Sequence, residues 1–280
     1  MSYGWPVKPF DRQHPVRAFF GDPRIGAGGG TSFHFGIDVS AADGTAVYAA
    51  RAGTVHLNAA GGSQNIAVTS PGITLGYWHV VPAVRNGQHV AQHALLGHIA
   101  APWGHVHLAE RTPGGPYLNP LRPGALAPFT DLGAPRVDRI VAERNGHPLD
   151  VDTLTGVVAL VAEAHDVTPV APPPPYTHMP VTPALVRWRL VAHAAEVVPW
   201  RTTADFRTAL PDNSRYHSVY APGTTQNHPP SPGRYRFQLA AAFDTTAHRD
   251  GSYRLDVEVA DTRGNASRGH LALTITNAPV

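Results

Sequence analysis

Glycine and proline interrupt this 280-residue chain so often that few segments can form long helices. The chain has 27 Gly and 28 Pro, and the short segments between them alternate apolar and polar residues. Alternation with a period of two places apolar side chains on one face of a β-strand, whereas glycine and proline both destabilise helix interiors. We therefore expect an all-β fold built from short antiparallel strands.

The first 128 residues have the pattern of a compact β unit. Residues 31–57 contain a turn at Asp43-Gly44 followed by alternation, which predicts a hairpin of short strands. Residues 65–79 continue the alternation across a Pro71-Gly72 turn, which predicts a β-meander. In the last strand of this meander the pattern places four residues on one face, namely Ile73, Leu75, Tyr77 and His79.

Residues 129–280 have the pattern of a second β domain. The proline run at residues 172–175 predicts an extended loop between strands. Residues 253–259 alternate most regularly, and a polar turn then leads into a further apolar strand. Several short strands separated by such turns predict an antiparallel β-sandwich. We accordingly divide the chain into a β unit at residues 1–128 and a sandwich at residues 129–280.

Charge and composition argue against several classes of protein. The formal net charge is +2 and no run of Lys or Arg concentrates it, which argues against nucleic acid as a partner. The absence of cysteine excludes disulfides and thiolate zinc sites. No run of about 18 apolar residues predicts a membrane span, and the first twenty residues lack the apolar core of a signal peptide.

Histidine is abundant, so each histidine motif must be weighed against chance. With 17 His in the chain, about one His-x-His pair is expected at random. His105 and His107 form such a pair in a predicted strand, on one face and about 6.5 Å apart, so that one could bind a metal while the other does chemistry. His34 and Asp38 would lie about 13 Å apart in a straight strand, so the chain must bend between them. Gly36 lies midway, and its access to positive φ would permit that bend.

Two histidines and one carboxylate can hold a tetrahedral zinc ion with its fourth position open to water, as in catalytic sites. Six segments in order carry a resemblance to a known family, namely "HFGID", "GTAVYAARAGTV", "GYWHV", "VRNGQHV", "LLGHI" and "HVHLAE". Over roughly residues 20–120 the chain resembles the LytM/lysostaphin-type zinc metallopeptidases of family M23. The resemblance implies that His34, Asp38 and His107 bind Zn²⁺ and that His79 and His105 are the catalytic residues.

The same resemblance implies an endopeptidase that cleaves Gly-containing or D-amino-acid-containing peptides of bacterial peptidoglycan, outside the cell or at its wall. The chain contains no His-Glu-x-x-His motif, so a neutral imidazole is the candidate general base, and either His79 or His105 fits that role. The chain departs from the family pattern by carrying Trp103-Gly104 where Gly-Pro is usual. It also lacks a Tyr before His34; Tyr77 is a substitute, although an aromatic packed on the sheet is the favoured interpretation.

Two alternatives to an active enzyme remain. An inactive scaffold of the same fold could bind the wall or regulate another wall hydrolase, but such scaffolds lack a metal ligand and none is missing here. A structural or sugar-binding β protein with incidental histidines does not explain the ordered motifs. The second domain resembles immunoglobulin-like domains of bacterial surface proteins; it could bind wall or glycan or dock on the peptidase, and we favour docking. We expect a monomer.

The remaining polar residues favour structural roles. His89 and His93 could form a second metal site, but the flanking glycines favour turn and edge positions. Glu110 could orient a zinc-bound histidine, or it could be a solvated or capping carboxylate. Three carboxylates could be calcium ligands, but their spacing matches no calcium loop and favours turns; they are Asp244, Asp250 and Asp261.

Overall fold

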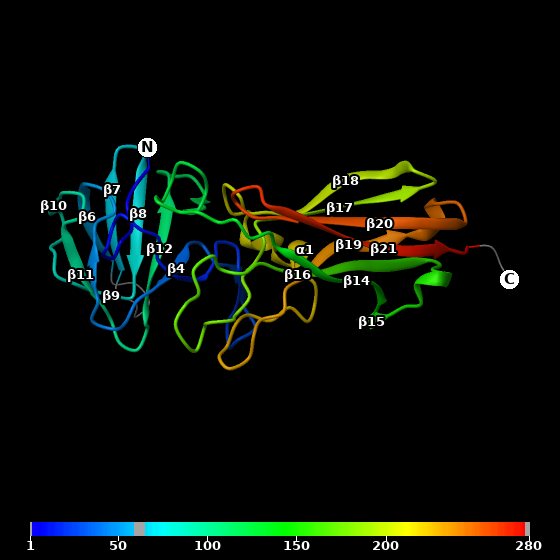
Figure 1. The fold of residues 1–280 in the computed structure, drawn as a ribbon, viewed down its shortest axis with the longest axis horizontal. Coiled ribbons are helices and arrows are strands. Elements are labelled where there is room, and N and C mark those ends of the chain that lie inside the picture. Colours follow the sequence, from blue (N-terminus) through cyan, green and yellow to red (C-terminus); the bar gives the residue numbers. More distant parts are fainter. Residues whose placement is uncertain (1, 59–64, 278–280) are drawn as a thin grey trace.

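The computed structural model describes residues 2–58 and 65–277, and the molecule is elongated (Figure 1). Strands from the first half of the chain form one end, and strands from the second half form the other end, where the C-terminus lies. The architecture is nearly all β, as predicted. The described residues include one α-helix, α1 (Tyr216–Val219), and three short 3-10 helices, η2 (Val151–Thr153), η3 (Asn213–Arg215) and η4 (Thr245–Ala247).

The N-terminal half contains three antiparallel sheets. The largest has the order β1-β4-β12-β8-β7-β6-β10, with β13 paired to β12. Its strands are β1 (Val16–Ala18), β4 (Ile37–Ser40), β6 (Gly53–Asn58), β7 (Asn65–Ser70), β8 (Ile73–Trp78), β10 (His89–Val90), β12 (His105–Arg111) and β13 (Tyr117–Leu118). A second sheet joins β5 (Ala46–Tyr48), β11 (Leu95–Ile99) and β9 (Val80–Pro82), and a third pairs β2 (Pro23–Ile25) with β3 (Thr31–Phe33).

The predicted meander is confirmed, because β6, β7 and β8 pair in sequence order. The hairpin predicted within residues 31–57 is wrong, because β4 and β5, which flank the Asp43-Gly44 turn, lie in different sheets. Strand β5 pairs with β11, while β6 pairs with β7. Ala49 and Ala50 lie between β5 and β6 and are fully buried, so the chain passes from one sheet to the other through the core. Alternation identified these strands but not their partners.

The C-terminal half consists of two four-stranded antiparallel sheets that contact each other through β14 and β21. One has the order β15-β14-β16-β19, with β14 (Arg136–Arg144), β15 (His147–Pro148), β16 (Val157–His165) and β19 (Arg236–Asp244). The other has the order β18-β17-β20-β21, with β17 (Leu185–Ala192), β18 (Ala195–Asp205), β20 (Gly251–Ala260) and β21 (Ala266–Ile275). The proline run lies in the loop between β16 and β17, as predicted. An immunoglobulin-like topology and the division at residue 128 stay predictions.

The two halves share one hydrophobic core. At their junction the ring of Phe33, the last residue of β3, lies 5.4 Å from the rings of Phe206 and Tyr216 and 5.9 Å from that of Tyr220. Polar contacts accompany this packing, since the Ile25 amide donates to Gln226 Oε1 over 2.6 Å. The C-terminal half is therefore packed directly against the segment that leads to His34.

No helix within residues 2–58 and 65–277 has the length and apolar character needed to cross a membrane.

Candidate metal centre

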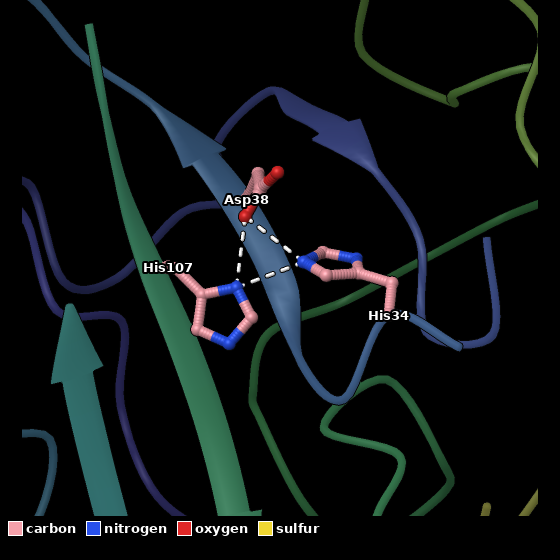
Figure 2. A group of neighbouring side chains, drawn as sticks. All are labelled: His34, Asp38 and His107. Carbon is pink, nitrogen blue, oxygen red and sulfur yellow. Dashed lines mark hydrogen bonds and ion pairs between the residues drawn. The ribbon is translucent and has the colours of Figure 1, made fainter. Parts of the chain in front are cut away.

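Strands β4 and β12 place two of the predicted ligands side by side. They pair antiparallel with Asp38 directly opposite His107. The third predicted ligand, His34, lies in the loop before β4, and its ring turns back toward the other two (Figure 2). All three are buried, with exposed fractions of 3% for His34, 7% for Asp38 and 5% for His107. The structure thus brings together the three residues that the sequence singled out.

The bend between His34 and Asp38 is present, but the expected reason for Gly36 is wrong. Gly36 does not have a positive φ. A Cβ at this position would instead lie 2.4 Å from the carbonyl oxygen of Leu108 and 2.7 Å from His107 Nε2. Glycine is required because the loop passes directly over β12 and over the ring of a candidate ligand.

The three side chains converge on one point through one atom each. His34 Nε2 lies 3.1 Å from Asp38 Oδ1 and 2.8 Å from His107 Nδ1, and His107 Nδ1 lies 3.0 Å from Asp38 Oδ1 (Figure 2). Ligand bonds near 2.0–2.1 Å around a tetrahedral ion place ligand atoms about 3.3 Å apart. The observed triangle is slightly tighter than that and is of the right size for zinc.

The protonation states of the three side chains decide whether this triangle could hold a cation. His34 Nδ1 lies 2.8 Å from the Phe19 carbonyl oxygen, which can only accept, so Nδ1 carries the proton and Nε2 presents a lone pair. Burial, followed by the nearby Arg24 charge, lowers the pKa of His34 to about 3, and burial also lowers the pKa of His107. Burial acts to raise the pKa of Asp38, but the neighbouring histidines outweigh it and hold that pKa well below its usual value.

The neutral ring of His107 has two tautomers. Its Nδ1 can donate to Asp38 Oδ1, or Nδ1 can present a lone pair while the proton lies on Nε2, which is buried without a partner among the described residues. In the second tautomer two imidazole nitrogens and one carboxylate oxygen direct lone pairs at one point, which is the form that binds a cation. The donor set of two imidazole nitrogens and one carboxylate oxygen is one that Zn²⁺ accepts.

His105 lies at the edge of this triangle, on the same face of β12 as His107. Its Nε2 is 3.4 Å from Asp38 Oδ1. Its Nδ1 lies 2.7 Å from the Trp103 carbonyl oxygen and 2.6 Å from Arg17 Nη2. The carbonyl favours a proton on Nδ1 and the guanidinium favours a lone pair there, so both tautomers of His105 have a partner.

His79 reaches the same place by leaving its strand. It directly follows β8 and has a φ of 65°, so it does not continue the buried face formed by Ile73, Leu75 and Tyr77. The prediction that His79 shares that face is wrong for this reason. Its ring stacks on Trp103 at 3.7 Å and lies 4.7 Å from the ring of His105. Burial, followed by the charge of His105, lowers the pKa of His79 to about 3.

The candidate ligands come from β4, the loop before it, and β12, in the order His, Asp, His along the chain. Residues 32–120 match the model of peptidase family M23. We call these residues, which make up about a third of the chain, the M23 segment. The resemblance seen in the sequence is thereby confirmed at the level of the family.

Several solved structures are similar to part of the chain. The catalytic domain of lysostaphin from Staphylococcus simulans is 21% identical, with a TM-score of 0.31, over 35% of this chain and 80% of that one. A zinc-containing peptidase from Vibrio cholerae is 21% identical, with a TM-score of 0.33, over 40% of this chain and 37% of that one. Csd3 from Helicobacter pylori is 18% identical, with a TM-score of 0.37, over 48% of this chain and 37% of that one. No curated protein matched the sequence. The family assignment rests on the family model.

A cavity of about 500 Å³ opens onto His34, Asp38 and His107, which we call the M23 triad. The C-terminal half forms part of the cavity wall. From the M23 segment and the strand before it come His79, Trp103 and Arg17. From the C-terminal half come Tyr176, Gln226, Asn227, His228 and Tyr235. The Arg17 guanidinium lies 4.3 Å above the Tyr176 ring, so the two walls touch at the cavity.

Sequence reasoning missed two arginines at the site. Arg24 Nη2 donates to Asp38 Oδ2 over 3.2 Å, which leaves Oδ1 to face the histidines. Arg17 contacts His105 from β1. Neither lies in a histidine motif, and only the pairing of β1 with β4 brings Arg17 to the site. No local signal in the sequence could have identified them.

The secondary candidates have structural roles. Tyr77 is fully buried, and its hydroxyl accepts from the Ala50 amide, so it is a core aromatic. Both interpretations of Glu110 are wrong, because it is buried, accepts from Tyr3 over 2.8 Å and pairs with Arg122 through both oxygens. His93 stacks on the ring of Phe10 at 3.8 Å. Asp244 caps the 3-10 helix η4, as a turn carboxylate should.

Proposed function

We propose that this protein is a zinc-dependent endopeptidase that hydrolyses peptide bonds of bacterial peptidoglycan, in the stem peptide or the cross-bridge. The observation that carries the proposal is the convergence of three lone-pair donors on one point beside a large cavity, within the M23 segment. Because the family's substrate lies outside the cell membrane, we further propose an extracellular or wall-associated site of action.

His34, Asp38 and His107 would hold the zinc ion through Nε2, Oδ1 and Nδ1. A zinc ion bound there would polarise the scissile carbonyl and lower the pKa of a bound water, which supplies the nucleophile near neutral pH. Arg24 holds the second oxygen of Asp38, so the carboxylate presents Oδ1 toward the two histidines. The Phe19 carbonyl similarly fixes the ring of His34.

His105 is the candidate general base. With its Nδ1 proton donated to the Trp103 carbonyl, its Nε2 is free to accept a proton from water beside Asp38. The resulting imidazolium keeps the Nδ1 hydrogen bond and can return the Nε2 proton to the leaving amine. Arg17 Nη2 lies 2.6 Å from His105 Nδ1 and helps to hold the ring in place.

His79 is the candidate donor to the developing oxyanion. Stacking on Trp103 holds its ring in place, and its lowered pKa keeps it neutral near pH 7, with one N–H available to donate. The Trp103-Gly104 departure from the family pattern is therefore used here to position a histidine. The second wall, from the C-terminal half, would supply polar side chains to a bound peptide. The packing of that half against Ile25 and Phe33 supports the docking role that we favour for it.

The proposal is tested by measuring zinc content and the release of new amino groups from purified peptidoglycan on the same samples. The native chain is compared with His105→Ala and with the matched control His98→Ala, which removes an exposed histidine of β11. We expect cleavage by the native chain and the control. We expect His105→Ala to keep zinc but to lose about 10²-fold to 10⁴-fold in rate.

Mass spectrometry of the released fragments would identify the bond that is cleaved. Full activity in His105→Ala would refute the assignment of the general base. Zinc binding by the native chain without cleavage of any wall peptide would instead favour an inactive scaffold that binds the wall.

A further inference from the structure

Three buried carboxylates meet at the junction of the two halves, away from the M23 triad. Asp131 lies between β13 and β14, Asp166 directly follows β16, and Asp261 directly follows β20. One oxygen of each lies within 4.8 Å of the others. Their exposed fractions are 5%, 1% and 3% respectively. Three segments far apart in the sequence thus place three acidic groups in one buried space.

The protein's own cations do not neutralise this group. Arg263 interacts electrostatically with Asp261 and Asp131, and its guanidinium lies 4.9 Å from the Phe129 ring. Its Nε is buried without a partner, and within residues 2–58 and 65–277 it forms no ion pair with the three carboxylates. Burial, followed by the other acidic groups, raises the pKa of Asp166 to about 8. Without a cation Asp166 is therefore mostly protonated at pH 7, and a bound cation would displace that proton.

One oxygen in the group has no partner at all. Asp166 Oδ1 accepts from the Val167 amide over 2.8 Å, but Oδ2 is buried and, among the described residues, accepts nothing. A cavity of about 10 Å³ is lined by all three carboxylates together with Asn119 and Thr182. That volume suits a single small occupant. An unpartnered carboxylate oxygen beside such a cavity indicates a bound cation.

We propose that Asp131, Asp166 and Asp261 bind one Ca²⁺ ion. The donor set consists of oxygens, without imidazole or thiolate, which suits a hard cation and not zinc. Calcium accommodates irregular cages built from several protein oxygens, whereas Mg²⁺ demands octahedral geometry and gives up its waters reluctantly. The turn role favoured for Asp261 is confirmed, because its Oδ1 accepts from the Arg263 and Asn265 amides in the turn after β20. Its acidic neighbours, which no sequence motif links to it, come from distant segments.

The ion would fix the C-terminal half against the M23 segment. Asp166 pairs with Val181 through both backbone bonds, and the next amide, that of Thr182, donates to Asp22 Oδ1 over 2.7 Å. The backbone carbonyl of Asp22 in turn accepts from the His34 amide over 2.8 Å. The loop closed by the Asp166–Val181 pair, residues 167–180, places Tyr176 in the wall of the cavity beside the M23 triad. Calcium would hold the base of that loop in place.

The test is the thermal unfolding of the full, zinc-loaded chain in calcium-free buffer and after titration with CaCl₂ or MgCl₂. We expect one calcium ion per chain by isothermal titration and a rise in Tm of about 5 °C once calcium exceeds its Kd by about 100-fold. Asp166→Asn should abolish the rise, and without calcium it should be about as stable as the native chain, because the amide replaces a carboxyl group that is already mostly uncharged at pH 7. The matched control Asp205→Asn, at an exposed carboxylate paired with Arg207, should keep the rise.

The inference does not depend on peptidase activity, and His107→Ala should show the same response to calcium. A native chain whose Tm and titration heat do not change with calcium would overturn the proposal without any variant being needed. An equal response to magnesium would overturn the assignment to calcium. A calcium response that survives in Asp166→Asn would show that the ion binds elsewhere.

Discussion

Replacing Gly36 by alanine should disable the candidate metal centre without removing any ligand. The new Cβ would lie 2.4 Å from the Leu108 carbonyl oxygen, 2.7 Å from His107 Nε2 and 2.9 Å from His107 Cε1. Ordinary van der Waals contact begins at 3.4 Å, so the loop and β12 must separate by about 1 Å. Metal ligands tolerate displacements of about 0.2 Å. The strain therefore acts directly on the distance between His34 and His107.

We expect Gly36→Ala to weaken zinc binding about 10-fold to 100-fold, and to lower the free energy of unfolding by about 1–3 kcal/mol. Zinc affinity is measured by competition with a chromophoric chelator, starting from metal-free protein. The matched control is Gly28→Ala, where a Cβ meets nothing within 4 Å and φ is not positive. An unchanged zinc Kd in Gly36→Ala, with normal cleavage, would refute the reasoning.

Three further predictions concern pH, a buried ion pair and the metal. Burial raises the pKa of Asp22 from 3.8 to about 7, so the folded state keeps a proton that the unfolded state releases near pH 4. Between these two pH values the free energy of unfolding should therefore fall as pH rises, by on the order of 4 kcal/mol. Calorimetry at saturating zinc should find a shallower fall in Asp22→Asn. Glu110→Ala leaves Arg122 and Tyr3 without their shared carboxylate and should cost about 2–4 kcal/mol in urea unfolding, while zinc content stays at the native level; a loss of zinc would mean that Glu110 supports the metal after all. Removing zinc with a chelator should lower Tm, because the buried lone pairs lose their cation, but should leave the response to calcium intact; a Tm that does not move on zinc removal would argue against a metal at the triad.

Much of the N-terminal half could be predicted from the sequence because its information is local. Alternation and turn residues identified the strands of the meander, and the ordered motifs singled out the three residues that β4 and β12 bring together. The failures also have a common cause. The pairing of β5 with β11, and not with β6, depends on packing in the core. The alternation of apolar and polar residues identifies a strand but not its partner. Gly36 was identified correctly, but for its backbone freedom, whereas contact with a distant strand is what requires it.

The second wall of the cavity and the acidic group could not be predicted. Gln226 and Tyr176 reach the M23 segment only because Phe33 packs into an aromatic cluster of the C-terminal half. Asp131 and Asp166 have no motif, and the sequence identified only the turn role of Asp261. Each of these features depends on the junction between the two halves, which no single segment of the sequence encodes.

The central claim is that His34, Asp38 and His107 hold a catalytic zinc ion, and elemental analysis together with peptidoglycan cleavage on the same sample tests it most directly. The account predicts close to one zinc per native chain, with release of amino groups from peptidoglycan, and the loss of both in His107→Ala. A native chain that contains no zinc after purification and zinc supplementation, or a His107→Ala variant that binds zinc and cleaves like the native chain, would contradict it.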